Sequence, residues 1–211
     1  VDFDDLLTLP VKIMKEHPWT QGYVLKKLEF DVKNRNFVNL NLQNKAVVLT
    51  VSGLVIDNGS IEKVEEIRFN SKDDKINFEV LDKCSRAVIF YTIPAGFDYL
   101  NKAAMRLLFD RTYGELERRC EKYFGKVIVG SMTDEYPLLP QWTEGFIEEF
   151  KKRKGYDLKP DLVSLYYNTG DNTAKVRFDF YDVLSTLAEE SIYKPLYGFH
   201  VEMVGRLIEQ Q

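Results

Sequence analysis

Apolar and polar residues alternate with a period of two along much of the first 95 residues, as they do in strands that bury one face. The alternating apolar positions are Val47, Leu49 and Val51 and, further along, Ile76, Phe78 and Val80. The strands predicted from this pattern span 23–32, 45–56, 61–69, 75–81 and 87–93. Between the second and third, Asn58-Gly59 supplies the positive backbone angles of a tight hairpin. The pattern therefore predicts an antiparallel β module over 1–95. Residues 2–15 fit either a short helix interrupted at Pro10 or a loop.

The period changes to about 3.6 after Pro94, which indicates an amphipathic helix. Its apolar face is formed by Ala104, Leu108, Thr112, Leu116, Cys120 and Phe124. Asn101 is suited to cap the start of this helix, and Gly125 is suited to end it in a left-handed conformation. The chain thus changes from strands to helices near position 95.

Two more helices are predicted further along. The first spans 143–155 and ends in the basic run 151–154, because cations are favoured at a helix C-terminus by the helix dipole. A phosphate or nucleic-acid patch is the alternative interpretation of this run. The second helix spans 173–204, and Pro195 inside it removes a backbone hydrogen bond. We therefore expect this helix to kink or split near Ser191.

Between the helices lies KVIVGSM, residues 126–132, a short apolar run rich in β-branched residues. Such a run is typical of a parallel strand covered by helices on both faces, and its alternation with helices predicts an α/β barrel or a small open sheet. A complete eight-stranded barrel takes roughly 250 residues, whereas 116 remain after position 95. The predicted fold class is therefore α/β, with a partial (β/α)8-barrel segment over 96–211 after the β module over 1–95.

Two adjacent carboxylates, Asp134 and Glu135, come directly after this predicted strand. Ligands bind at the carboxyl ends of the strands of parallel sheets, so the position suits a catalytic or ligand-binding acid. A solvated loop is the commoner interpretation of the pattern alone, and a metal site in a small α/β domain is another. Glycoside hydrolysis needs two carboxyl groups on either side of one bond. Glu135 supplies one, and Asp134 points to the other face if the strand pleat continues, so the pattern lacks the partner acid.

Composition excludes several other classes of protein. The net charge of -4 and the pI near 5.4 disfavour nucleic acid, whose phosphates require a basic face. An apolar run of about 18 residues, as a membrane span requires, is lacking, and the acidic start VDFDDLLTLP is unlike a secretory signal. We therefore predict neither a nucleic-acid nor a membrane partner.

The residues that usually hold cofactors or carry out nucleophilic catalysis are few. Cys84 and Cys120 lack metal-type spacing, and as unpaired thiols they favour a cytoplasmic location without fixing it. His17 and His200 lie far apart in the chain, so neither a two-histidine metal site nor a catalytic triad has a local signature. The glycines form no phosphate-binding loop. The sequence thus predicts no metal and no cofactor in this chain.

Four segments that follow one another in the second half carry a family resemblance. They are GFDYLN (96–101), YFGKVIVGSMTDEYP (123–137), WTEGFIEEFKKRKGYDLKPDL (142–162) and VRFDFYDVLSTLAEESIYKPL (176–196). Together they resemble the α-L-rhamnosidase-type glycoside hydrolases of bacterial type, in which such segments occur in this order within a (β/α)8 barrel. The β module also resembles the β-rich insertion that this family carries between early barrel strands.

The resemblance implies roles for individual residues. Glu135 matches the catalytic acid of the family, at the end of a barrel strand. Asp134 matches the neighbouring acid that would bind sugar or hold Glu135 in place. Asp98 and Trp142 match positions close to the sugar pocket.

The chain also departs from the family. The family continues with further barrel strands, a second catalytic carboxylate and calcium-associated residues, and this chain ends at Gln211 without them. The expected function is therefore a portion of a glycoside hydrolase that cleaves rhamnose-like glycosides by general acid catalysis, with calcium allowed in the complete protein. Such a chain should be inactive alone and should associate with a second copy or with the remainder of a larger chain. The alternative is a non-catalytic carbohydrate-binding or scaffold module derived from that fold.

Overall fold

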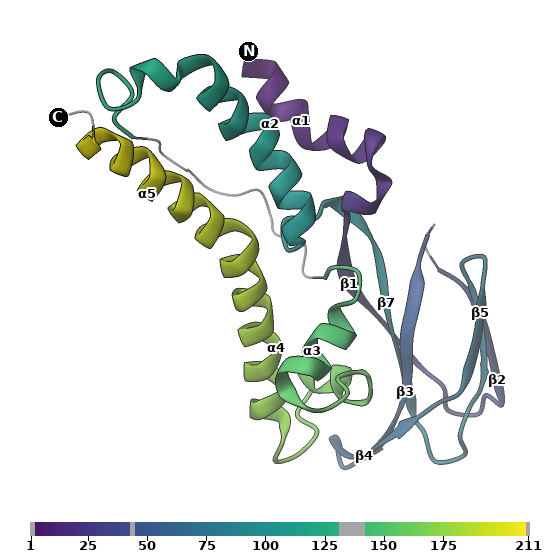
Figure 1. Ribbon diagram of the computed structural model, residues 1–211. Coiled ribbons are helices and arrows are strands. Elements are labelled where there is room, and N and C mark those ends of the chain that lie inside the picture. The colour runs from purple at the N-terminus through teal and green to yellow at the C-terminus, as the bar shows by residue number, and fades with distance from the viewer. Residues whose placement is uncertain (1–2, 43–44, 131–141, 210–211) are drawn as a thin grey trace. The chain divides into compact units, whose positions relative to one another are not determined.

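The computed structural model describes residues 3–42, 45–130 and 142–209 (Figure 1). The α-helices are α1 Phe3–Glu16, α2 Lys102–Cys120, α3 Phe146–Lys154, α4 Thr173–Ala188 and α5 Lys194–Glu209. The strands are β1 Gln21–Asp31, β2 Phe37–Asn41, β3 Val47–Asp57, β4 Ser60–Glu66, β5 Phe69–Lys72, β6 Lys75–Glu79 and β7 Arg86–Phe97. Short 3-10 turns cover Pro18–Thr20, Glu121–Tyr123 and Lys159–Leu165, and Glu189–Tyr193 is π-helical. Within these ranges, no helix is both long and apolar enough to cross a membrane.

The chain forms two compact units, and each is built from separate stretches of sequence. Unit 1 comprises 1–22, 95–143 and 184–211, and unit 2 comprises 23–94 and 144–183. Unit 1 holds most of the helices, whereas unit 2 holds most of the strands together with α3 and the first part of α4. The site and the surfaces described below each belong to one unit.

The strands form two antiparallel sheets, and the predicted barrel is wrong. One sheet has the strand order β1-β7-β3-β4 and the other has the order β2-β6-β5. The pairings of β3 with β4 and β7, and of β6 with β2 and β5, are all antiparallel. Two such sheets combined with helices, without a (β/α)8 pattern in the described residues, contradict an α/β fold with a partial barrel segment.

The segment predicted as a parallel strand explains this error. Its described part, 126–130, forms a turn with one isolated bridge, between Phe124 and Ile128. The side chains of Val127 and Val129 are 75% and 70% exposed. A parallel strand gains its stability from hydrogen-bonded neighbours and from the helices that cover it. An apolar, β-branched run indicates strand propensity, but it does not specify a partner.

The β module follows the sequence pattern more closely. Ser60 pairs with Asp57, which leaves the two-residue loop predicted for this hairpin, and both loop residues have positive φ (47° at Asn58 and 81° at Gly59). The prediction missed β2 and β5, the two outer strands of the second sheet. Both are short, at five and four residues, and β5 has Phe69 as its single apolar residue, so neither gave a long alternating pattern.

The core of unit 2 lies against β3 and β7. Val51, Ile76, Ala87 and Ile89 are completely buried there. Gly53 of β3 belongs to this region for a steric reason: a Cβ atom at this position would lie 2.4 Å from the sulfur of Cys84. Burial raises the pKa of the Cys84 thiol above its ordinary value. This buried cysteine thus packs as a small apolar side chain.

The helices of unit 1 confirm the predicted Asn101 cap and settle the open question at the N-terminus. Residues 3–16 form one helix that continues through Pro10. Asn101 caps α2 as expected, because its side-chain oxygen accepts hydrogen bonds from the backbone amides of Ala103 and Ala104 at 2.9 and 3.2 Å. The helix ends at Cys120, earlier than the predicted Gly125.

The long C-terminal helix is interrupted where Pro195 predicts it. The segment Glu189–Tyr193 between α4 and α5 is π-helical. Pro195 has no N–H for the carbonyl of Ser191, so the regular ladder cannot continue across this turn. The hydroxyl of Ser191 donates to the backbone oxygens of Tyr99 and Leu187, both at 2.7 Å. The irregular turn is therefore held against the residues that precede α2 within unit 1.

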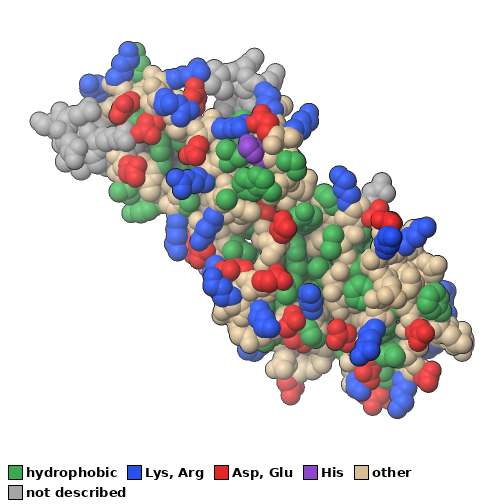
Figure 2. Space-filling view, turned by 45° about the vertical axis from the view of Figure 1, so that its right-hand side comes forward, with side chains coloured by type: hydrophobic (Ala, Val, Ile, Leu, Met, Phe, Trp, Pro, Cys, Tyr) green, Lys and Arg blue, Asp and Glu red, His purple; other side chains and the backbone are tan. Residues whose placement is uncertain are grey.

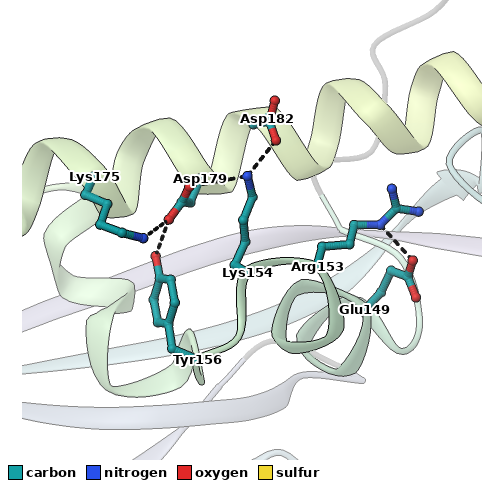
Figure 3. A network of polar contacts seen from close by, with 7 residues as sticks. All are labelled: Glu149, Arg153, Lys154, Tyr156, Lys175, Asp179 and Asp182. Atoms are coloured by element: carbon teal, nitrogen blue, oxygen red, sulfur yellow. Dashed lines mark hydrogen bonds and ion pairs between the residues drawn. The ribbon is translucent and has the colours of Figure 1, made fainter.

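A polar network in unit 2 joins the end of α3 to α4 (Figure 3). The Lys154 amine lies 2.6 Å from Asp182 and 3.3 Å from Asp179, and the Tyr156 hydroxyl donates to Asp179 at 3.0 Å. Lys175 also pairs with Asp179. The basic end of α3 is therefore engaged in ion pairs as well as lying at the negative end of the helix dipole.

Titration of Asp179 gives the first testable prediction. Burial raises the pKa of Asp179, but hydrogen bonds from Lys175, Tyr156 and Lys154 outweigh it, so this pKa lies below the usual value. The network therefore contributes stability above the pKa of about 4 that an unfolded aspartate has, and this contribution is lost as the pH falls through the lower folded value. We expect Asp179→Asn to lower the free energy of unfolding by about 1–3 kcal/mol at pH 7. The deficit should shrink below about pH 4.

Urea unfolding of both proteins between pH 7 and pH 3 measures this deficit. Asp82→Asn is the matched control, because Asp82 is exposed and, among the described residues, forms no ion pair. Its difference from the unsubstituted protein should stay within about 0.5 kcal/mol. A deficit for Asp179→Asn that does not depend on pH would contradict the role assigned to its charge.

Candidate functional site

The strongest candidate site in unit 1 begins where β7 ends. Gly96 has a φ of 87°, and its carbonyl accepts a hydrogen bond from the Gln21 side chain at 2.6 Å. The backbone amide of Asp98 donates to Thr20 at 2.8 Å. These bonds fix the path of the chain between β7 and the start of α2. The sequence can take this path because glycine adopts positive φ at little cost.

Asp98 occupies the centre of this turn, with its side chain completely buried. One carboxylate oxygen accepts a hydrogen bond from the amide of Leu100 at 3.1 Å, and the other accepts one from the hydroxyl of Thr143. A buried carboxylate is costly unless donors surround it, and both of its oxygens have a donor here. Asp98 therefore holds two segments of the chain together and cannot itself contact a ligand in solvent.

Trp142 precedes Thr143 and is 5% exposed. Its indole is largely covered by protein, so it does not offer an open face on which a sugar could stack. The bond between Thr143 and Asp98 joins residues that are 45 positions apart in sequence. Two of the four predicted site positions, Asp98 and Trp142, are thus brought to one region of unit 1.

The other two predicted site residues, Asp134 and Glu135, lie outside the described residues. They occur in the sequence between the α2 region and Trp142. Thr143, which follows Trp142, is held in place by its hydrogen bond to Asp98. The sequence pattern did not indicate this role for Thr143. In the sequence, a threonine next to a tryptophan forms no motif of distinctive spacing, so nothing marked Thr143 as a site residue.

The described residues contain no group of three or more His, Cys, Asp or Glu side chains arranged to hold a metal ion. Figure 2 shows acidic and basic side chains interspersed over the face that it presents. Mixed charges of this kind do not build the single-sign surface that electrostatic steering of a polyanion requires.

A second polar cluster belongs to unit 2 and includes Tyr167. Glu29 accepts hydrogen bonds from Tyr167, from Lys27 at 3.2 Å and from Arg86 at 2.7 Å. Lys27 also lies 4.5 Å from the centre of the Tyr167 ring. Burial raises the pKa of Glu29, but its three hydrogen-bonding neighbours outweigh this and hold that pKa below the usual value. Glu29 is thus an ionised anchor for two cations.

Tyr166 has a different environment from Tyr167. Its ring lies 5.7 Å from that of Phe90, yet the residue is 43% exposed. Burial raises the pKa of its hydroxyl. Tyr166 therefore packs on the sheet and presents only part of its surface to solvent.

The architecture is that of an α+β protein with two antiparallel sheets, and its described site is a buried carboxylate that links the end of β7 to Thr143. No protein-family model matches the chain, and no curated protein matches it. The resemblance to α-L-rhamnosidase-type enzymes therefore stays a prediction made from the residues.

Proposed function

We propose that this chain is a portion of a glycoside hydrolase that acts on rhamnose-like glycosides, in which Glu135 is the general acid of the hydrolysis. The observation that carries the proposal is the contact between Asp98 and Thr143. It joins the segments GFDYLN and WTEGF, two of the motifs on which the resemblance rests. Motifs that serve one pocket must meet in space, and these two meet.

The proposed chemistry assigns one proton transfer to Glu135. In its neutral form the acid would donate a proton to the glycosidic oxygen as the bond to the sugar breaks, and water would take the place of the leaving group. A general acid must be protonated at working pH, which requires burial or a nearby negative charge to raise its pKa. Asp134, the adjacent residue in the sequence, is a source of such a charge.

The buried residues are assigned supporting roles. Asp98 positions the segment that begins at Trp142 and does not touch the sugar. Trp142 would form the packed base of the site. This assignment replaces direct sugar binding by Asp98, because both oxygens of its carboxylate are already hydrogen-bonded inside unit 1.

A non-catalytic sugar-binding module is the second candidate, and the burial of Asp98 favours it. A second catalytic carboxyl group must face the scissile bond. Asp98, the predicted site carboxylate that the structure describes, is 0% exposed and cannot do so. A chain that offers one acid would bind a sugar without cleaving it.

Tryptophan fluorescence tests both candidates, because the chain has only two tryptophans and they differ in exposure. Trp19 is 48% exposed and Trp142 is 5% exposed. In Trp19→Phe, the emission of Trp142 should change saturably with L-rhamnose and should not change with mannitol. Trp142→Phe, which keeps only Trp19, is the control that should not respond. Saturable binding by this chain, together with release of nitrophenol from nitrophenyl α-L-rhamnoside by the complete protein that carries it, supports the enzyme, and binding without release supports the module. Absence of any response would refute both.

A further inference from the structure

Unit 2 contains a cavity of about 460 Å³ that no step of the proposed function uses. One side is formed by the β3–β4 hairpin and the start of β7, and the other by the chain from Tyr167 to Gly170. Gly59 and Gly170 line it on opposite sides, and an added Cβ at either would meet no atom within 4 Å. The volume falls in the range of sites that hold small molecules.

Arg86 is the charged residue among the described residues that line this cavity. Its side chain is 52% exposed, and one terminal nitrogen, Nη1, donates to Glu29 at 2.7 Å. The other edge of the guanidinium, formed by Nε and Nη2, has no partner among the described residues. These two parallel N–H groups match the two oxygens of a carboxylate.

Glu29 accepts a hydrogen bond from the Nη1 nitrogen of Arg86 and leaves the Nε–Nη2 edge unengaged within the described part of the chain. Arg86 donates to one carboxylate oxygen of Glu29, and Lys27 and Tyr167 donate to the other. The guanidinium is therefore fixed by an ion pair on one edge while the other edge remains available to a ligand. An arginine that is ordered before binding loses less conformational freedom when the ligand arrives.

The remaining lining residues suit a hydroxylated ring rather than a bare carboxylate. Asn168 accepts hydrogen bonds through its side-chain oxygen from Gly170 and Thr173, which leaves its amide nitrogen as a donor. Ser60 adds a hydroxyl, and Leu54, Ile61 and Tyr167 add apolar surface. A few fixed polar groups on an apolar wall are typical of sites that orient a small ligand.

We infer that this cavity binds the carboxylate of an acidic sugar, a hexuronate, through the free edge of Arg86, with Asn168 and Ser60 contacting the ring hydroxyls. The site lies wholly in unit 2, whereas the proposed hydrolytic site lies in unit 1. Hexuronate binding is thus separate from the proposed function, and either can fail while the other holds.

Titration of the full chain with D-glucuronate, followed by amide NMR signals, tests this inference. We expect saturable shifts confined to the lining residues, with a dissociation constant on the order of 1 mM. D-Glucose, which lacks the carboxylate, and acetate, which lacks the ring, should each bind at least about tenfold more weakly, because each offers only half of the contacts. Glucose binding as tightly as glucuronate would overturn the role of Arg86. Acetate binding as tightly would overturn the role of the ring.

Substitutions at two arginines provide the matched comparison. Arg86→Gln should weaken glucuronate binding at least about tenfold, whereas Arg68→Gln, which makes the same charge change at a separate cavity of unit 2, should leave it unchanged. Arg86→Lys retains a cation that can pair with Glu29, which guards against a folding defect. A lysine has no pair of parallel N–H groups for a carboxylate, so this variant should also bind glucuronate weakly. Wild-type affinity in Arg86→Lys, or equal losses in Arg86→Gln and Arg68→Gln, would contradict carboxylate recognition by Arg86.

Discussion

Glu135→Gln in the full-length protein is expected to lower kcat for an ordinary rhamnoside by about 10²- to 10⁴-fold, with KM little changed. Glutamine keeps the shape and hydrogen-bonding capacity of the acid but has no proton to give to the departing oxygen. The loss should be small for an aryl rhamnoside whose leaving group departs without protonation. Steady-state kinetics with both substrates, at saturating concentration, measures this difference.

Two further variants separate catalysis from charge and from folding. Glu148→Gln is the same chemical change at an exposed position of α3 and should leave kcat unaltered. Asp134→Asn should move the alkaline limb of the pH–rate profile to lower pH, because removal of a neighbouring negative charge lowers the pKa of the acid. Full activity of Glu135→Gln on the ordinary rhamnoside, or its failure to fold, would make Glu135 a structural residue.

Asp98→Ala is expected to lower the free energy of unfolding by about 2–4 kcal/mol, the largest effect on stability that we predict. The substitution removes two hydrogen bonds to a charged group and leaves the Thr143 hydroxyl without its acceptor. Asp110→Ala, at an exposed position of α2, is the control and should change stability by less than about 0.5 kcal/mol. Urea unfolding measures both.

A double-mutant cycle then isolates the contact itself. Thr143→Val alone should cost about 1–3 kcal/mol, because it leaves a buried carboxylate short of one donor. The same substitution on the Asp98→Ala background should cost much less, giving a coupling free energy on the order of 1–3 kcal/mol. Strictly additive costs would mean that the two side chains act independently, and the proposed anchoring of the Trp142 segment would then be wrong.

Features decided by a few neighbouring residues could be predicted from the sequence. The Asn58-Gly59 loop and the Asn101 cap are local, since each depends on a side chain or backbone angle within three residues. The break before Pro195 is local as well. Physical rules for turns, caps and proline apply directly to such short segments.

Features decided by distant partners could not be predicted. The run 126–130 has the composition of a buried strand but lacks strand neighbours among the described residues, so composition alone indicated the wrong fold class. The bond between Asp98 and Thr143 joins residues with no shared periodicity. The resemblance placed Asp98 close to a sugar pocket, whereas the structure shows a buried carboxylate that holds two segments of the chain together.

The interleaving of the two units has a consequence for the order in which the chain can fold during synthesis. Unit 2 can close once Val183 has emerged, whereas unit 1 must wait for the residues after 184. Helix α1 therefore stays without the last part of its unit until residues 184–211 have emerged. The contact between Ser191 and Tyr99, 92 positions apart, can form only in this last stage. Long-range closure of this kind is slow, so the parts of unit 1 that precede 184 wait for those last residues before their apolar side chains are covered.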